Sequence, residues 1–216
     1  MSVPYQVASS IASEIMRGLA PHCERIALAG SLRRLRPTVH DIDLIAIPRL
    51  TSKSSLFGRS KLAETDFMSA LLDFAEDDDG NARANCAGDK IIRFKARGDL
   101  FRLSVDCYIA QEIQVDCYIA TPETFATLLL IRTGSAEHNI WLAQRAKACG
   151  GKLHADGSGL ELPGQYDPVA QRVVNMRVLR AQTEEEIFKA LGLPLPLPAD
   201  RECKDGRPVW LPGEAS

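Results

Sequence analysis

Two aspartates in the segment AGSLRRLRPTVHDIDLIAIP have the type and spacing for phosphate chemistry. Asp41 and Asp43 lie two residues apart in an apolar run, so on a strand both carboxylates point to the same face. Strand interiors disfavour aspartate, and two like charges on one face repel each other unless a cation lies between them. Mg²⁺ is a hard ion that binds carboxylate oxygens together with substrate phosphates. The pair therefore predicts a magnesium site for phosphoryl transfer.

A Gly-Ser pair ten residues earlier offers a place for a phosphate group. Gly30 and Ser31 end a predicted strand and begin a turn or helix, where backbone N–H groups and a hydroxyl can bind an anion. Arg34, with Arg33 beside it, adds a guanidinium fork that suits phosphate oxygens. A lone D-x-D pattern is typical of a solvent-exposed edge strand, but the basic Gly-Ser segment ahead of it favours a catalytic site.

The elements that must position these residues follow from hydrophobic periodicity. We expect helices over 4–20 and 61–75, and strands over 25–30, 39–48 and 90–96. Two copies of VDCYIA, ten residues apart, are also strand-like. Thr121 and Pro122 then predict the N-cap and first residue of a helix that ends near residue 133.

The rest of the chain predicts a smaller helical unit. We expect a helix over 136–148, a hairpin that turns at Asp156-Gly157, and a helix capped by Thr183 with Glu186 as its capping-box partner. The segment after Pro194 is proline-rich and is expected to be extended. The fold class is therefore α+β, with one unit over 1–120 and a second over 121–216.

Bulk composition limits the classes of function. The 216 residues carry a net charge of −2, so the molecule is not a generally basic nucleic-acid binder. Six cysteines without a C-x-x-C pair indicate core thiols in a reducing compartment. No apolar run is long enough for a membrane helix and no signal peptide is recognisable, so we expect a cytoplasmic protein, or one in the host cytoplasm if a virus encodes it.

Three ordered motifs resemble one enzyme family. G-S-L-R-R-x(6)-D-I-D resembles the signature of the nucleotidyltransferase superfamily, and specifically of family X DNA polymerases. RTGSAEHN, at 132–139, resembles the T-G-S…N element that opens their thumb, and KLHADGSGLE with TEEEIFKALGLPLPLPADRE resembles the remainder of it. The resemblance runs from about Ile26 to Glu202. It implies a nucleotidyltransferase palm, a mixed sheet flanked by helices, over 1–120, and a small α/β thumb over 121–216.

The resemblance also implies the reaction and its partners. We expect a monomeric DNA-directed DNA polymerase that adds nucleotides to a primer 3′-hydroxyl, in short-gap filling during DNA repair. Its substrates would be a nucleoside triphosphate and primer-template or gapped DNA, and it would use two Mg²⁺ ions, with Mn²⁺ as a substitute. The alternative is a transferase that acts without template, as a terminal transferase, or on a small molecule, an RNA end or a protein.

The roles of individual residues follow from the same resemblance. Three aspartates would hold the metal ions, three residues of the Gly-Ser motif would hold the phosphates, and three thumb residues would contact the sugar and base of the nucleotide. In that order they are Asp41, Asp43 and Asp116; Gly30, Ser31 and Arg34; and Gly134, Ser135 and Asn139.

The third carboxylate could come from either VDCYIA copy, in which the aspartates are Asp106 and Asp116. Asp116 precedes Gly134 by eighteen residues, which matches the family, and a predicted helix cap follows it. We therefore favour Asp116 and interpret the first copy as a tandem duplication with Asp106 as a bystander.

Two departures from the family pattern bear on function. Ile131 and Arg132 occupy the places of two aromatic residues that select against ribonucleotides in the family, so the preference for deoxyribonucleotides is open. Gln114 occupies the place of an arginine that pairs with the third aspartate, so we expect Asp116 to lack that orienting partner.

Overall fold

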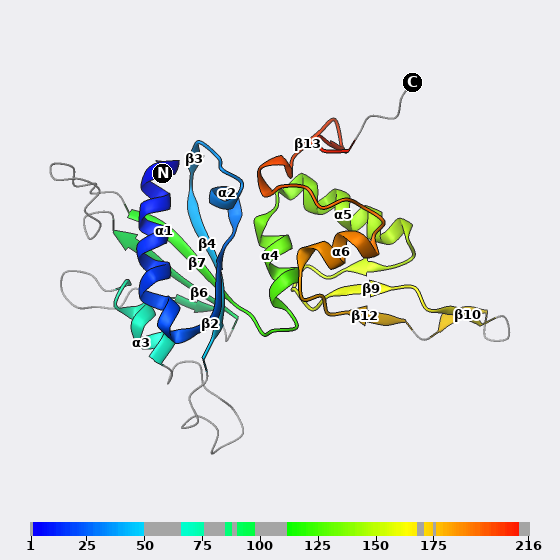
Figure 1. The fold of residues 1–216 in the computed structure, drawn as a ribbon, viewed down its shortest axis with the longest axis horizontal. Coiled ribbons are helices and arrows are strands. Elements are labelled where there is room, and N and C mark those ends of the chain that lie inside the picture. The colour runs from blue at the N-terminus through cyan, green and yellow to red at the C-terminus, as the bar shows by residue number, and fades with distance from the viewer. Residues whose placement is uncertain are drawn as a thin grey trace, which may run out of the picture. The chain divides into compact units, whose positions relative to one another are not determined.

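The protein is described by a computed structural model that covers residues 2–49, 66–75, 85–87, 90–97, 112–167, 171–174 and 176–211. The chain divides into two compact units, Met1–Ala120 and Thr121–Ser216. Figure 1 traces the elements of both. The first VDCYIA copy, and with it Asp106, lies outside the described residues.

A five-stranded mixed sheet forms the centre of the first unit, which confirms the predicted α+β class. The β4–β7 pair is parallel, and the remaining pairs of the sheet are antiparallel. In spatial order the strands are β2 (Cys23–Leu28), β4 (Asp41–Pro48), β7 (Glu112–Ile119), β6 (Ile91–Arg97) and β5 (Asn85–Ala87).

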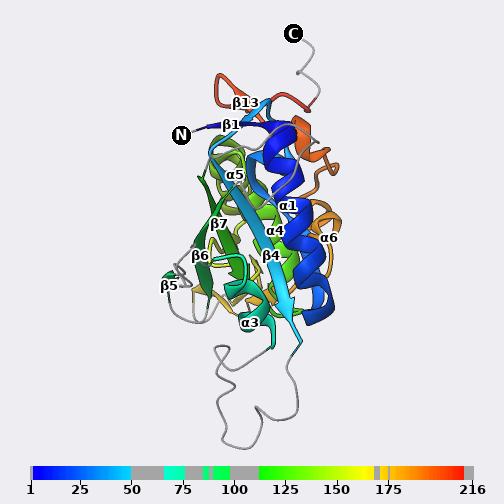
Figure 2. The ribbon, with the colours of Figure 1, turned by 90° about the vertical axis from the view of Figure 1, so that its left-hand side faces the viewer.

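One face of this sheet is covered by α1 (Tyr5–Leu19) and α3 (Asp66–Leu72), as Figure 2 shows. Both helices were predicted; α3 ends at Leu72, before the predicted end at 75, and the predicted start at 61–65 lies outside the described residues. Side chains from α1 at helical spacing join alternate strand residues in one core; they are Ala8, Ile11, Ala12, Ile15 and Leu19. Because this core covers one face of the sheet, polar residues of the central strands can lie on the opposite face.

Short elements connect the larger ones in this unit. The helical turn η1 (Ala20–His22) leads from α1 into β2, and α2 (Gly30–Arg33) connects β2 with the following strands. The strands β1 (Val3–Pro4) and β3 (Thr38–Val39) pair as a separate two-stranded sheet.

The second unit packs three helices around its own core, which is separate from that of the first. The helices are α4 (Phe125–Thr133), α5 (Ala136–Ala148) and α6 (Glu184–Ala190). A sheet in the order β12-β9-β8 accompanies them, formed by β8 (Lys152–Leu153), β9 (Leu160–Leu162) and β12 (Arg177–Leu179). The remaining elements are β10 (Gln165–Asp167), β11 (Arg172–Val174), η5 (Pro198–Asp200), β13 (Cys203–Lys204) and β14 (Arg207–Pro208).

Two helix starts in this unit were predicted from local capping signals, and one of the two predictions was correct. Thr183 Oγ1 accepts from the Glu186 N–H at 3.3 Å, so the predicted cap is confirmed. Glu186 Oε2 accepts at 3.0 Å from the N–H of Gln182, one residue before the cap, instead of from the Thr183 N–H as in a standard capping box. The predicted cap at Thr121 is wrong, because α4 begins at Phe125 after a turn in which the Thr121 N–H donates to Thr124 Oγ1.

The segment after Pro194 is not extended throughout, because η5 and a hairpin of β13 and β14 interrupt it. In the described part of the chain, no helix combines the length and the apolar character that crossing a membrane requires.

Candidate active site

Three of the predicted site carboxylates lie on one face of two neighbouring strands. Asp41 and Asp43 belong to β4, and Asp116 belongs to β7. The parallel register pairs Asp43 with Asp116 and Asp41 with Gln114. Because register partners point to the same face of a sheet, all three carboxylates project from that face. Asp116 is buried, at 3% exposure, and the other two are half-buried.

The core on the opposite face explains why the aspartates point away from it. Ile42 and Leu44 flank Asp43 on β4, Val115 and Cys117 flank Asp116 on β7, and all four are fully buried. A slip of one residue in either strand would bury the carboxylates and expose these apolar side chains. The hydrophobic alternation therefore holds the polar face in place.

The Gly-Ser turn packs directly against Asp43. Gly30 has a φ of +64°, and a Cβ at this position would overlap Asp43 Oδ2 and lie 3.0 Å from its Cγ. The Ala29 N–H donates to the Asp43 carbonyl oxygen at 2.8 Å, which ties the start of α2 to β4. Glycine is required here because the backbone conformation is left-handed and because the carboxylate occupies the space of a side chain.

Ser31 and Arg34 lie on the same turn. Ser31 Oγ is buried and has no hydrogen-bond partner among the described residues, so its hydroxyl is available to a ligand. The Arg34 N–H donates to the Gly30 carbonyl oxygen at 3.2 Å, which closes the turn, and the Arg34 side chain is half-buried. A buried hydroxyl and a guanidinium on one turn, whose Gly30 packs against Asp43, suit an anionic substrate.

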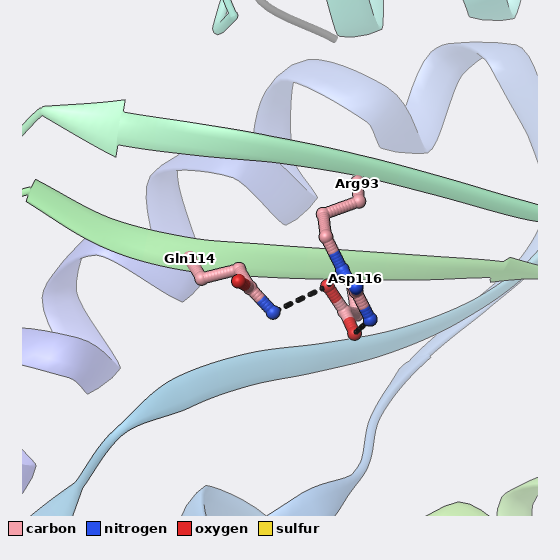
Figure 3. A network of polar contacts seen from close by, with 3 residues as sticks. All are labelled: Arg93, Gln114 and Asp116. Carbon is pink, nitrogen blue, oxygen red and sulfur yellow. Dashed lines mark hydrogen bonds and ion pairs between the residues drawn. The ribbon is translucent and has the colours of Figure 1, made fainter. Parts of the chain in front are cut away.

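Arg93, on β6, forms the closest polar contact in the site. Its Nε donates to Asp116 Oδ1 and its Nη2 donates to Asp116 Oδ2, each at 2.7 Å. Gln114 Nε2 also donates to Asp116 Oδ1, at 3.0 Å (Figure 3). The hydrogen bond to Asp116, with the charge of that carboxylate, raises the pKa of the Arg93 guanidinium further above its ordinary value.

Although position 114 carries glutamine in place of the expected arginine, Asp116 has orienting partners that the sequence did not indicate. Gln114 itself donates to the carboxylate, and the guanidinium comes from the neighbouring strand, where the antiparallel register pairs Arg93 with Asp116. In the sequence, Arg93 stands out only as a basic residue at a polar position of a strand that alternates apolar and polar residues. Nothing local to that strand indicates its register with β7.

The predicted thumb residues lie together in the second unit. The Gly134–Ser135 peptide bond is cis, and Ser135 Oγ caps α5 by accepting from the His138 N–H at 3.3 Å. Asn139 Nδ2 donates to the Ile131 carbonyl oxygen at 2.7 Å, while Asn139 Oδ1 is buried without a hydrogen-bond partner among the described residues. The Asn139 side chain is therefore held through its NH₂ group, and its Oδ1 is available as an acceptor for a ligand.

The donor set of the first unit fits Mg²⁺ in chemistry but is not a preformed cage. The three aspartates offer only hard oxygen ligands, although within the described residues no three acidic, histidine or cysteine side chains are grouped closely enough to hold a metal alone. Mg²⁺ is usually bound by one or two carboxylates, with waters and substrate phosphates as its other ligands. Asp41 and Asp43 are the residues that would supply those carboxylates, with Asp116 beside them.

Comparisons with known proteins agree on one relationship. Residues 128–202 match a family described as DNA polymerase beta thumb, and this match lies in the second unit. The DNA polymerase/3'-5' exonuclease PolX of Bacillus subtilis (strain 168) is 28% identical to this chain over 201 residues. That alignment covers 92% of this chain and 28% of the relative, so the chain spans little more than a quarter of the relative's length.

Proposed function

We propose that this chain, a family X DNA polymerase-like protein, adds nucleotides to the 3′-hydroxyl of a DNA primer. The observation that carries the proposal is the pairing of Asp43 with Asp116 on adjacent parallel strands, with the Gly30 turn packed on the Asp43 carboxylate. In this proposal Met1–Ala120 acts as the palm and Thr121–Ser216 as the thumb.

In the proposed mechanism each group of the first unit has one task. Two bound Mg²⁺ ions, or Mn²⁺ in their place, would supply Lewis-acid stabilisation of the charge that develops on the phosphate oxygens. Asp41, Asp43 and Asp116 would hold those ions, and the Ser31 hydroxyl with the Arg34 guanidinium would bind the outer phosphates of the nucleoside triphosphate. Asp116 would also orient the primer 3′-hydroxyl and accept its proton as the 3′-oxygen bonds to the α-phosphate and pyrophosphate leaves. Positioning and charge stabilisation account for most of the rate in phosphoryl transfer.

The second unit would hold the sugar and the base of the nucleotide. Gly134 and Ser135 form the turn at the start of α5, and Asn139 keeps its Oδ1 acceptor available to the incoming base. Ile131 and Arg132 replace the aromatic pair of the family, so we propose weak discrimination between deoxy- and ribonucleotides. The biological role proposed is short-gap filling in DNA repair, by a monomer in the cytoplasm.

Primer extension tests this function most directly. Labelled primers, single-stranded, annealed to template or in a short gap, are incubated with Mg²⁺ and either dNTPs or rNTPs. We expect templated addition by the wild-type chain, and its loss in Asp43→Asn and Asp116→Asn. Asp106→Asn is the matched control, because the same sequence surrounds it in the first VDCYIA copy.

The outcomes separate the alternatives. Equal extension with and without template identifies a terminal transferase. If no primer is extended while a small molecule, an RNA end or a protein becomes labelled, the polymerase proposal fails. If Asp106→Asn abolishes activity and Asp116→Asn retains it, the assignment of the third carboxylate is wrong.

A further inference from the structure

The hydrogen bonds of Asp116 leave its two carboxylate oxygens in different states. Oδ1 accepts from both Arg93 Nε and Gln114 Nε2, whereas Oδ2 accepts from Arg93 Nη2. Each carboxylate oxygen has about two lone-pair sites. The three bonds therefore fill Oδ1 and leave Oδ2 with one further site, so Oδ2 is the oxygen that can contact a cation or a hydroxyl.

Arg93 is also a cation placed on a carboxylate of the candidate metal site. Asp116 has Asp43 as its register partner on one side and Arg93 on the other. The Asp116 side chain is 5% exposed, whereas that of Arg93 is 54% exposed. The carboxylate is therefore enclosed by the sheet, while the guanidinium keeps contact with solvent, in which it can be hydrated if another cation takes its place.

We propose that Arg93 is a positioning residue that competes with divalent cations for Asp116 and keeps cation binding weak until the nucleotide is present. This inference rests on the proposed function for its nucleotide, but its competition with a metal ion can be measured without any reaction. The positive charge of Arg93, in contact with Asp116, reduces the attraction of the three-aspartate face for a divalent ion. The anionic phosphates of a nucleotide restore that attraction, so cation and nucleotide bind together rather than in sequence.

Two substitutions at Arg93 separate its charge from its geometry. Arg93→Met removes both the charge and the two-point contact with Asp116. Arg93→Lys keeps a positive charge but cannot reproduce the bidentate fork. Lys95→Met is the matched control. Lys95 is exposed and lies two residues along β6 on the same face as Arg93, but its register partner on β7 is Gln114 instead of Asp116.

The probe is Mn²⁺ alone, with its binding to the full chain followed by electron paramagnetic resonance at a pH well above the carboxylate range. We expect Arg93→Met to bind Mn²⁺ about three- to tenfold more tightly than the wild type, a range expected for a charge at a solvent-accessible site. Arg93→Lys should restore an affinity within about twofold of the wild type. Asp43→Asn should weaken binding in every background.

Added dNTP gives a second readout. It should tighten Mn²⁺ binding strongly in the wild type and less in Arg93→Met, and this difference is not expected from a merely structural contact. If Arg93→Met binds Mn²⁺ no more tightly than Lys95→Met does, the competition is refuted. If the metal affinities follow the expected order but no primer is extended, the polymerase proposal fails and the role of Arg93 stands.

Discussion

Replacement of Gly30 by alanine tests the packing on which the candidate site depends. The added Cβ would overlap Asp43 Oδ2, so either the turn or the carboxylate must move. Asp43 is a short side chain whose Cβ lies 3.1 Å from the new atom, so rotation of its carboxylate alone gives little relief. We therefore expect Gly30→Ala to displace a proposed metal ligand as well as to destabilise the fold.

The magnitude follows from a comparison with Gly206. Gly206 has a φ of +75°, close to the +64° of Gly30, but nothing lies within 4 Å of its Cβ position. Gly206→Ala therefore carries the left-handed backbone cost alone, about 1 kcal/mol. Gly30→Ala adds an overpacking cost of about 1–3 kcal/mol. At about 2–4 °C per kcal/mol, the Tm should fall about twice as far or more in Gly30→Ala.

Thermal unfolding followed by circular dichroism measures the Tm of both variants, and primer extension with Mn²⁺ binding measures the site. We expect Gly206→Ala to retain nucleotide addition, whereas Gly30→Ala loses it by about a hundredfold or more, as expected for a misplaced catalytic group. Equal losses of stability in the two variants, or activity in Gly30→Ala within about threefold of the wild type, would refute the proposed contact with Asp43.

Two further predictions concern stability. The buried Arg201 guanidinium donates to the Glu184 carboxylate at 2.6 and 3.1 Å. Glu184→Gln removes the charge of that carboxylate, so it should lower the free energy of unfolding of the second unit by about 3 kcal/mol. As the control, Glu185→Gln at an exposed position should change that free energy by less than about 0.5 kcal/mol. Burial raises the pKa of the Cys23 thiol from 9.0 to about 11, so the unfolded chain ionises first and stability should fall as the pH rises through that interval, by at most about 3 kcal/mol. Unfolding measured against pH should show a shallower alkaline decline in Cys23→Ala, and an unchanged decline would contradict the assignment.

Much of the fold and part of the candidate site could be predicted from the sequence, because the signals involved are local. The alternation in DIDLIAIP placed Asp41 and Asp43 together on one face of a strand, and the structure contains that strand as β4. The cap at Thr183 likewise depends on residues within one helical turn. Where a local signal was ambiguous, as at Thr121, the predicted helix start was wrong.

Strand register could not be predicted in this way, because pairing depends on packing across the whole sheet. The two VDCYIA copies are locally identical, and to choose between them the sequence offered only the distance to Gly134 and a predicted helix cap that was wrong. Tertiary structure placed Asp116 opposite Asp43, and the same register brought Arg93 onto its carboxylate. The sequence by itself determined which residue types could carry the chemistry and on which elements they lie. Only the buried core beneath the sheet, which holds each strand to one register, decided which of those side chains meet.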